Sequence, residues 1–221
     1  MKHAVRTVLF DLDGTLVDSA PDLAAAANAL LLEHGRAALP YERFRPMVGS
    51  GARGMVGVGF GFKPGDEPFE GLKTRFLALY AERLLERTQV FEGVWPVIDR
   101  LEAHGMAWGI VTNKAHHLAL AVTQGLGLHA RARVLIGGDT TPHVKPHPAP
   151  LLEACRQLQV TPDACVYVGD DRRDVQAGRA AGMGTLAAAW GYLGQGEPIH
   201  EWGADALLDQ PQALLHWLDL P

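Results

Sequence analysis

Apolar and polar positions change their spacing near residue 90 of the chain. After Phe91, short apolar runs typical of buried strands alternate with segments whose apolar residues recur at helical spacing. The predicted strands, including one near the start of the chain, are Val8–Phe10, Ala107–Val111, Arg133–Ile136, Cys165–Val168, Thr185–Ala189 and Ala206–Leu208. The predicted helices of this region are Val94–His104, His117–Leu126, Pro148–Leu158, Arg173–Ala181 and Gln212–Leu218. This alternation predicts an α/β fold with a Rossmann-like, mostly parallel sheet and crossover helices.

Residues 16–88 have a different pattern, in which helical periodicity dominates and no strand is predicted. The predicted helices are Ser19–Gly35, Tyr41–Met47, Gly51–Phe62 and Phe69–Thr88. Ser19 is the candidate N-cap of the first helix, whose alanine content favours helix formation. We therefore expect residues 1–15 and 89–221 to form the α/β core, and residues 16–88 to form an inserted all-helical cap.

The composition of the 221 residues is that of a globular protein, with 48% hydrophobic and 20% charged residues. A formal net charge of −5 disfavours nucleic-acid binding, which requires clustered excess Lys and Arg. The apolar stretch within Met1–Phe10 is too short for a signal peptide, and no window is long enough for a membrane helix. We expect a cytoplasmic protein that binds no membrane, in which Cys155 and Cys165 are reduced core residues.

Two carboxylates follow the first predicted strand and precede a glycine. Asp11 and Asp13 are two positions apart, so in extended backbone their side chains point to the same side. An open α/β sheet binds its ligands outside the carboxyl ends of its strands. Two close anions need a cation there, and Mg²⁺ prefers a few carboxylate or carbonyl oxygens. Taken alone, the stretch also fits an Asp-Gly turn with solvated acids.

Later strands end in groups that suit phosphoryl transfer. Thr112 and Asn113 follow the second strand, Lys145 lies in the loop after the third, and Asp170 and Asp171 follow the fourth. A carboxylate can attack phosphorus to form an aspartyl-phosphate, and the phosphoryl oxygens then need donors and cations around them. The hydroxyl of Thr112 and the ammonium of Lys145 can supply these, and Asp170 completes a metal site.

Each of these groups also has a simpler interpretation. Thr112 could cap the next helix, Lys145 could be an exposed loop cation, and the acids after the fourth strand could be solvated first-turn residues. Two histidine pairs, His116 with His117 and His143 with His147, raise the question of a second metal site. No Cys or Glu at a suitable spacing supports that site. The joint placement of the groups at strand ends favours the functional interpretation.

Four segments, taken together and in order, resemble the motifs of the haloacid dehalogenase-like hydrolases: Asp11–Thr15, Val111–Asn113, Lys145–Pro146 and Gly169–Asp174. The resemblance implies that Asp11 is the nucleophile and that Asp13 is the general acid and base. Thr112 and Lys145 would hold the phosphoryl group. The resemblance also explains the helical cap, which that family inserts after the first strand.

The same resemblance implies a magnesium site and its surroundings. Its ligands would be Asp11, the main-chain carbonyl of Asp13, and Asp170. Supporting carboxylates would come from Asp171 and Asp174. The remaining expected contacts to substrate on the core are Gly14, Thr15 and Asn113.

Within the family, three stretches are similar to the phosphoglycolate phosphatase group and more closely to N-acetylmuramate 6-phosphate phosphatases of bacterial cell-wall recycling: Gly49–Arg53, Trp108–Lys114 and Trp202–Asp205. The resemblance implies a small phosphate ester that bears a carboxylate, with N-acetylmuramate 6-phosphate favoured over phosphoglycolate. Arg53 is suited to bidentate binding of that carboxylate, beside Ser50. The alternative for this cap segment is a flexible turn with a solvated arginine.

Other activities on the same fold have different requirements. A dehalogenase has no use for Asp13 as a proton donor, whereas a sugar-phosphate mutase would return the phosphoryl group to its sugar. A phospho-accepting signalling module would keep its phosphoryl group, and the cap argues against it. We expect a small-molecule phosphate ester as the binding partner, and a chain that is a monomer or a homodimer.

Overall fold

The central element is a six-stranded parallel sheet, which confirms the predicted α/β class. The computed structural model describes residues 5–220, so residues 1–4 and 221 of the predicted core lie outside the described residues. The strands lie in the order β5-β4-β1-β6-β7-β8. Their bounds in that order are Leu135–Ile136, Ala107–Val111, Thr7–Phe10, Cys165–Gly169, Gly184–Ala188 and Ala206–Leu208. Strand β1 is central, because Val8 pairs with Trp108 on one side and with Val166 on the other.

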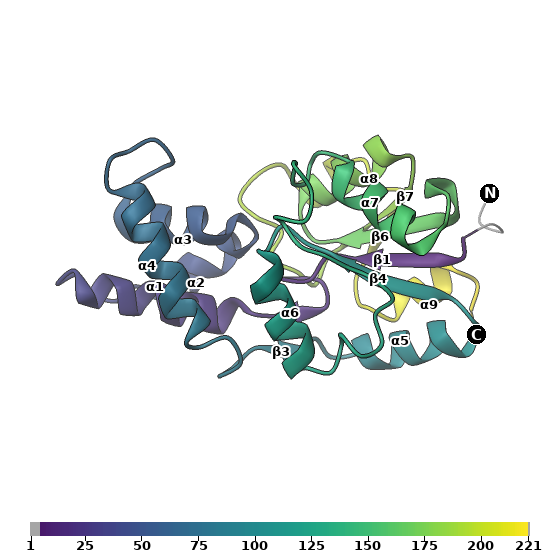
Figure 1. The fold of residues 1–221 in the computed structure, drawn as a ribbon, viewed down its shortest axis with the longest axis horizontal. Coiled ribbons are helices and arrows are strands. Elements are labelled where there is room, and N and C mark those ends of the chain that lie inside the picture. Colours follow the sequence, from purple (N-terminus) through teal and green to yellow (C-terminus); the bar gives the residue numbers. More distant parts are fainter. Residues whose placement is uncertain (1–4, 221) are drawn as a thin grey trace.

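Helices cover both faces of the sheet (Figure 1). Val8 and Phe10 pack with α5, α6 and α9 on one face, whereas Leu9 between them packs with α7 and α8 on the other. This is the side-chain alternation that an extended strand imposes. The bounds of these helices are α5 Val94–Ala103, α6 His116–Gly125, α7 Ala149–Leu158, α8 Arg172–Ala181 and α9 Ala213–Trp217. Short 3-10 turns occupy Pro162–Ala164 and Ile199–Glu201.

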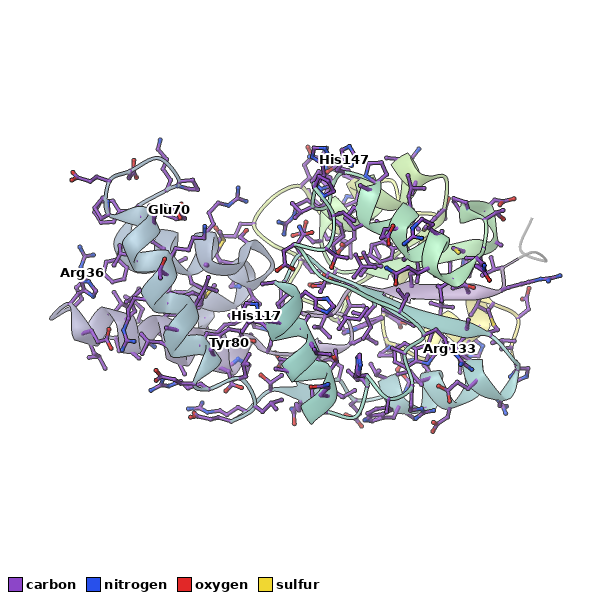
Figure 2. All side chains as sticks on the ribbon, viewed as in Figure 1. Arg36, Glu70, Tyr80, His117, Arg133 and His147 are labelled. Carbon is purple, nitrogen blue, oxygen red and sulfur yellow. The ribbon has the colours of Figure 1, made fainter. Side chains whose placement is uncertain are left out.

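Four further helices form a separate group beside the sheet, on the side away from both chain ends (Figure 1). They are α1 Ala20–Glu33, α2 Tyr41–Phe44, α3 Gly51–Phe60 and α4 Phe69–Ala81. Their apolar residues form one hydrophobic cluster, which also takes in Leu118 of α6 and Tyr192. Figure 2 shows Arg36 at the far end of this group and Tyr80 on the side next to α6.

Two short strands within and beside this region were not predicted. Strand β2, Val17–Asp18, pairs antiparallel with β3, Gln89–Val90. Each has only two residues, which is too short for the alternating pattern that identifies a strand. The chain therefore enters and leaves the helical region through one small ladder.

Helix α4 ends at Ala81, so the prediction of a helix to Thr88 was wrong. The cause is a buried carboxylate on another helix. Asp22 of α1 is fully buried and accepts hydrogen bonds from the backbone N–H of Arg87 at 3.0 Å and of Thr88 at 2.8 Å. The Thr88 hydroxyl donates to the same carboxylate at 2.6 Å. These bonds hold the backbone in the non-helical path that leads to β3.

Smaller differences concern the ends of elements. Helix α2 stops at Phe44 and continues as a 3-10 helix, Arg45–Ser50. The predicted third strand begins two positions later than expected, at Leu135. No helix within residues 5–220 has the length and apolar character that a membrane crossing requires.

Candidate active site

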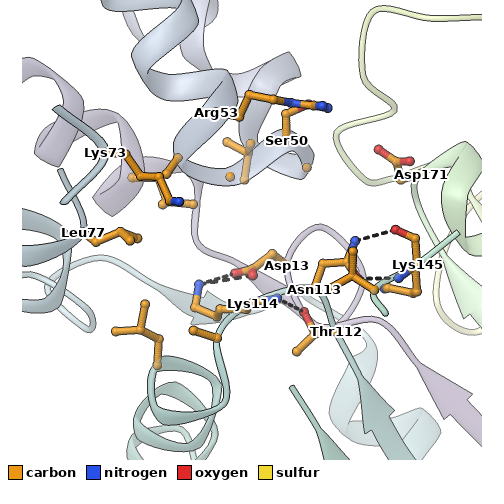
Figure 3. A pocket seen from close by; sticks show the side chains of 18 of the residues that line it. Asp13, Ser50, Arg53, Lys73, Leu77, Thr112, Asn113, Lys114, Lys145 and Asp171 are labelled. Atoms are coloured by element: carbon orange, nitrogen blue, oxygen red, sulfur yellow. Dashed lines mark hydrogen bonds and ion pairs between the residues drawn. The ribbon is translucent and has the colours of Figure 1, made fainter. Parts of the chain in front are cut away.

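A cavity of 480 Å³ lies between the carboxyl ends of the central strands and the helical group. It forms there because β1, β4 and β6 run parallel and all end at the same edge. Figure 3 shows its lining, with Arg53 and Lys73 on the helical side and Asp13, Thr112 and Lys145 on the sheet side. The predicted residues that line it are Asp11, Asp13, Ser50, Arg53, Thr112, Asn113, Lys145, Asp170, Asp171 and Asp174.

The ammonium of Lys145 joins two carboxylates at the floor of the cavity. Its Nζ lies 2.8 Å from Oδ1 of Asp11 and 2.8 Å from Oδ1 of Asp174. Burial by itself lowers the pKa of Lys145, but the two carboxylates outweigh that effect and raise it above its usual value. Lys145 therefore stays charged beside the predicted nucleophile.

Tyr167, which the sequence pattern placed in the core, also contacts Lys145. Lys145 Nζ donates to the Tyr167 hydroxyl at 2.7 Å, and that hydroxyl donates to the carbonyl of Val111 at 2.7 Å. Burial, together with Asp174 and Asp11, raises the pKa of Tyr167 well above its usual value, so the phenol stays neutral. An aromatic residue in a buried strand ordinarily serves in packing. The one signal in the sequence for a further role of Tyr167 is its polar hydroxyl, which the neighbouring Val residues lack.

Three carboxylates converge at the carboxyl ends of β1 and β6. Asp11, Asp170 and Asp174 have oxygens within 4.8 Å of one another. Burial, reinforced by the other two acids, raises the pKa of Asp170 well above its usual value, against hydrogen bonds from Tyr192 N–H and the Thr15 hydroxyl. Such mutual repulsion is what a bound cation relieves.

The donor set fits a hard divalent cation. Asp11 Oδ1 is buried and, among the described residues, accepts no hydrogen bond beside its ion pair with Lys145. Asp174 is more fully engaged, because Oδ1 faces Lys145 and Oδ2 accepts from the backbone N–H of Asp171 at 3.0 Å. Asp11 therefore retains the most capacity to bind a metal, since both oxygens of Asp170 also accept hydrogen bonds, from Thr15 and Tyr192. An all-oxygen set suits Mg²⁺ or Ca²⁺.

Gly14 and Thr15 support Asp170 and do not line the cavity. The Thr15 hydroxyl is fully buried and donates to Asp170 Oδ1 at 3.0 Å. Gly14 has a φ of +89°, and a Cβ at this position would lie 2.2 Å from Asp170 Oδ2. The tight turn after Asp13 thus depends on glycine both for its backbone conformation and for the space that Asp170 occupies.

Asp13 lines the cavity and has a separate set of hydrogen-bond partners. Lys114 Nζ contacts both of its carboxylate oxygens, at 3.0 Å and 3.1 Å, and the Ser19 hydroxyl donates to Oδ1. Ser19 is the N-cap residue of α1, as predicted, but its side chain makes no capping hydrogen bond. Its hydroxyl bonds Asp13, and the hydroxyl of Tyr192 accepts from the first backbone N–H groups of the helix, at Ser19 and Ala20.

Thr112 and Asn113 follow β4 and have distinct surroundings. Thr112 is buried at the cavity wall, and its hydroxyl oxygen accepts from the backbone N–H of Lys114 at 3.2 Å. Asn113 forms a two-point clamp on Lys145, because its side chain donates to the Lys145 carbonyl and accepts from the Lys145 N–H, both at 2.9 Å. The clamp fixes the loop that carries the ammonium of Lys145 (Figure 3).

Asp171 and Asp174 close the N-terminus of α8 as a capping box. Burial alone raises the pKa of Asp171, but the guanidinium of Arg173 holds it below its usual value. Arg173 Nε lies 2.7 Å from Asp171, and its Nη2 donates to the carbonyl of Gly49. This last bond joins the sheet side of the cavity to the segment that leads into α3.

Ser50 and Arg53 lie on the helical side of the cavity. Arg53 is exposed, and no hydrogen bond or ion pair connects it to the rest of the described chain. Lys73 of α4 also lines the cavity, but Glu70 lies 3.1 Å from it. Arg53 therefore presents the less compensated positive charge to a ligand.

The histidine pairs take no part in the acidic cluster. The rings of His143 and His147 lie 4.2 Å apart beside the Lys145 loop. Within residues 5–220, the group of Asp11, Asp170 and Asp174 is the one set of three or more residues whose geometry suits a metal.

The chain is similar in sequence to known proteins. Residues 8–188 match the model of the haloacid dehalogenase-like hydrolase family. The chain is 48% identical over 210 residues to a protein of Xanthomonas campestris pv. campestris named phosphoglycolate phosphatase, covering 95% of this chain and 94% of that one. It is 39% identical over 215 residues to a Pseudomonas aeruginosa protein named N-acetylmuramic acid 6-phosphate phosphatase, covering 97% and 95%.

A solved structure has the same architecture. The crystal structure of a protein of Haemophilus somnus 129pt, described as a predicted phosphoglycolate phosphatase, superimposes with a TM-score of 0.85 at 26% identity. The match covers 97% of this chain and 98% of that one.

The chain belongs to the haloacid dehalogenase-like hydrolase family. Within that family it is a phosphatase, which confirms the predicted enzyme class.

Proposed function

We propose that this chain is a magnesium-dependent, cytoplasmic phosphomonoesterase that acts through an aspartyl-phosphate at Asp11. The observation that carries the proposal is the buried contact between Asp11 and the charged Lys145, in a cavity that also contains Asp13 and Thr112. A carboxylate held beside an ammonium can attack a phosphoryl group whose negative oxygens the same ammonium attracts.

The proposed reaction has two steps, phosphorylation of Asp11 and hydrolysis of the aspartyl-phosphate. In the first, a carboxylate oxygen of Asp11 attacks phosphorus, the bond from phosphorus to the ester oxygen breaks, and Asp13 gives its proton to that oxygen. In the second, water attacks phosphorus and Asp13 takes a proton from it. The bond from phosphorus to Asp11 breaks, and inorganic phosphate leaves. Lys145 and the Thr112 hydroxyl hold the phosphoryl oxygens in both steps.

Mg²⁺ would be held by Asp11, Asp170 and the main-chain carbonyl of Asp13, with Asp171 and Asp174 supporting these ligands. When bound, it supplies positive charge that offsets the carboxylates and the developing charge on the phosphoryl oxygens. The convergence of three carboxylates and the raised pKa of Asp170 support this assignment.

The proposed substrate is a small phosphate ester that bears a carboxylate, with N-acetylmuramate 6-phosphate as the first candidate. Residues 16–88 would act as the cap. The hydrophobic cluster of the helices between Ala20 and Ala81 supports that role, whereas Leu16 and Val17 pack with the sheet. Arg53 supplies an uncompensated guanidinium above the phosphate site, suited to a carboxylate. A volume of 480 Å³ lies within the range of about 300–1,000 Å³ typical of sites for drug-sized ligands, which favours a sugar ester over a two-carbon one.

Phosphoglycolate is the second candidate, because the relative with 48% identity carries that name. Specificity constants for phosphate release from N-acetylmuramate 6-phosphate, phosphoglycolate, an uncharged hexose phosphate and an aryl phosphate test the choice. We expect the muramate ester to give the highest value. A higher value for phosphoglycolate would overturn the substrate assignment, and absence of phosphate release from every ester would overturn the phosphatase proposal.

The covalent step is tested separately. During turnover of an ester with a radiolabelled phosphoryl group, acid quenching should leave label on the wild-type protein. The Asp11→Asn variant should carry no label. Full turnover by that variant, once shown to be folded, would exclude the aspartyl-phosphate.

A further inference from the structure

One ammonium connects Asp13 to a helix of the cap region. Lys114 Nζ lies 3.0 Å and 3.1 Å from the two carboxylate oxygens of Asp13, and it also donates to the hydroxyl of Tyr80 at 2.7 Å. The side chain of Lys114 is only 6% exposed. Figure 3 shows it reaching Asp13 at the cavity wall, from the loop that follows β4.

The charges of the three groups make this arrangement strong. Burial by itself lowers the pKa of Lys114, but Asp13 and Tyr80 outweigh that effect and raise it above its usual value. Burial also raises the pKa of Tyr80, so its hydroxyl stays neutral beside the ammonium. A hydrogen bond from a charged donor is shorter and stronger than one between neutral groups.

Tyr80 is held rigidly on its own helix. It is 1% exposed, its ring stacks on Phe76 of the same helix with centroids 6.3 Å apart, and it packs in the cluster that includes Leu118. The ammonium of Lys114 also lies 4.6 Å from the centre of the Tyr80 ring. The place of this ammonium is therefore set by α4 as much as by its own loop.

Asp13 has an unusual requirement if it serves both steps of the proposed reaction. It must present an oxygen to the departing ester oxygen and later to water, with the same carboxylate orientation. A single ammonium that contacts both of its oxygens fixes the plane of the carboxylate. An ammonium without a second anchor could follow the carboxylate through several rotamers, because lysine has a long and flexible side chain.

We propose that Lys114 is a positioning residue for Asp13, and that the hydroxyl of Tyr80 acts through Lys114 so that the cap takes part in proton transfer. This inference rests on the proposed function of Asp13 as acid and base. The cap would then have two roles. Arg53 would select the substrate, and Tyr80 would affect the reaction of every ester whose leaving group must be protonated.

The test is the Tyr80→Phe variant, which removes the hydroxyl and keeps the ring. Single-turnover rate constants for phosphorylation of the enzyme are compared for an alkyl phosphate and an aryl phosphate. We expect a loss of about tenfold with the alkyl ester, which is below the roughly 10²–10⁴-fold worth of general acid catalysis itself. The aryl ester, whose leaving group needs little protonation, should lose less than about twofold. Substrate affinity should not change.

Two further variants make the test specific. Tyr41→Phe removes a hydroxyl from α2, outside the cavity lining, and should leave both rate constants unchanged. Lys114→Met removes the ammonium and should reproduce the alkyl-selective loss more strongly than Tyr80→Phe. Equal losses of the Tyr80→Phe enzyme on both esters, or no loss on either, would overturn the inference. A wild-type enzyme that releases no phosphate would instead overturn the proposed function.

Discussion

Gly191 lies directly against Asp170. A Cβ built at Gly191 would be 2.1 Å from the Cβ of Asp170 and 2.6 Å from its Oδ2, so no larger residue fits while Asp170 keeps its place. The next residue, Tyr192, donates its backbone N–H to the same Oδ2 at 2.8 Å. The segment after β7 therefore shapes the proposed metal site without providing a ligand.

Gly191→Ala should displace Asp170 and weaken metal binding. We expect roughly tenfold weaker Mg²⁺ affinity, in the range found when groups that orient metal ligands are removed. Overpacking should also lower the free energy of unfolding by about 1–3 kcal/mol. Calorimetric titration and thermal denaturation measure the two effects. Gly196→Ala is the matched control, because nothing lies within 4 Å of its Cβ position, and it should change neither quantity appreciably.

Asp11→Asn should reduce phosphate release by about three orders of magnitude or more, as expected when a nucleophile is removed. The change keeps the size of the side chain, so circular dichroism should show an intact fold. Asp99→Asn is the control, since Asp99 pairs with Arg131 at 2.6 Å on the surface. A folded Asp11→Asn enzyme with wild-type turnover would contradict the proposed nucleophile.

Magnesium affinity should fall as the pH falls. The pKa of Asp170 is raised well above its usual value, and that of Asp174 is raised to about 6, with burial as the main cause in both. Protons therefore compete with the metal at a pH where exposed carboxyls are fully ionised. Calorimetry should show tighter binding and smaller proton release at about pH 7.5 than at about pH 5.5. A pH-independent affinity over this range would contradict the raised pKa of Asp174.

The same raised pKa values affect the metal-free protein. An acid with a raised pKa in the folded state binds more protons there than in the unfolded state, so its contribution to stability decreases as the pH rises through the shifted range. For Asp174 that range runs from its usual 3.8 to about 6. Asp174→Asn should flatten this part of the stability curve, measured by urea denaturation at several pH values.

Arg53→Ala should affect only substrates that bear a carboxylate. Loss of a charge-assisted hydrogen bond costs roughly 1.5 to 3 kcal/mol, which lowers the specificity constant about ten- to a hundredfold. An aryl phosphate without a carboxylate should be nearly unaffected. Arg43→Ala, another arginine of the helical region that does not line the cavity, is the control. Parallel losses on all substrates would assign Arg53 to phosphate binding or to cap structure.

The sheet and its polar edge follow from short-range patterns in the sequence. Val8–Phe10 and Cys165–Val168 are continuous apolar runs; Asp11 directly follows the first, and Asp170 follows the second after Gly169. Because parallel strands end at one edge, the positions of Asp11 and Asp170 in the sequence are enough to place them together. Local pattern and topology agree here, which is why the prediction of the fold was correct.

Contacts between distant segments could not be predicted in the same way. Ser19 was correctly predicted as the N-cap residue of α1, but the hydroxyl of Tyr192, 173 positions away, accepts from its N–H, and this contact was not predicted. Lys114 was noted only as the last residue of the stretch Trp108–Lys114, and its partner Tyr80 lies on a helix whose pattern indicates only packing. Such pairs depend on how the helical region is placed against the sheet, which no local periodicity records.

The small ladder of β2 and β3 affects how the inserted helical segment can vary in length and sequence. Val17 and Val90 are paired in it, so the two ends of the inserted segment are already fastened together. The length of the insertion then enters the folding free energy of the sheet mainly as loop-closure entropy, which rises by only about 0.6 kcal/mol for each doubling. One continuous stretch of chain can therefore be lengthened, shortened or exchanged while the sheet keeps its place, provided that the replacement retains the contacts of Ser19 with Asp13 and of Tyr80 with Lys114.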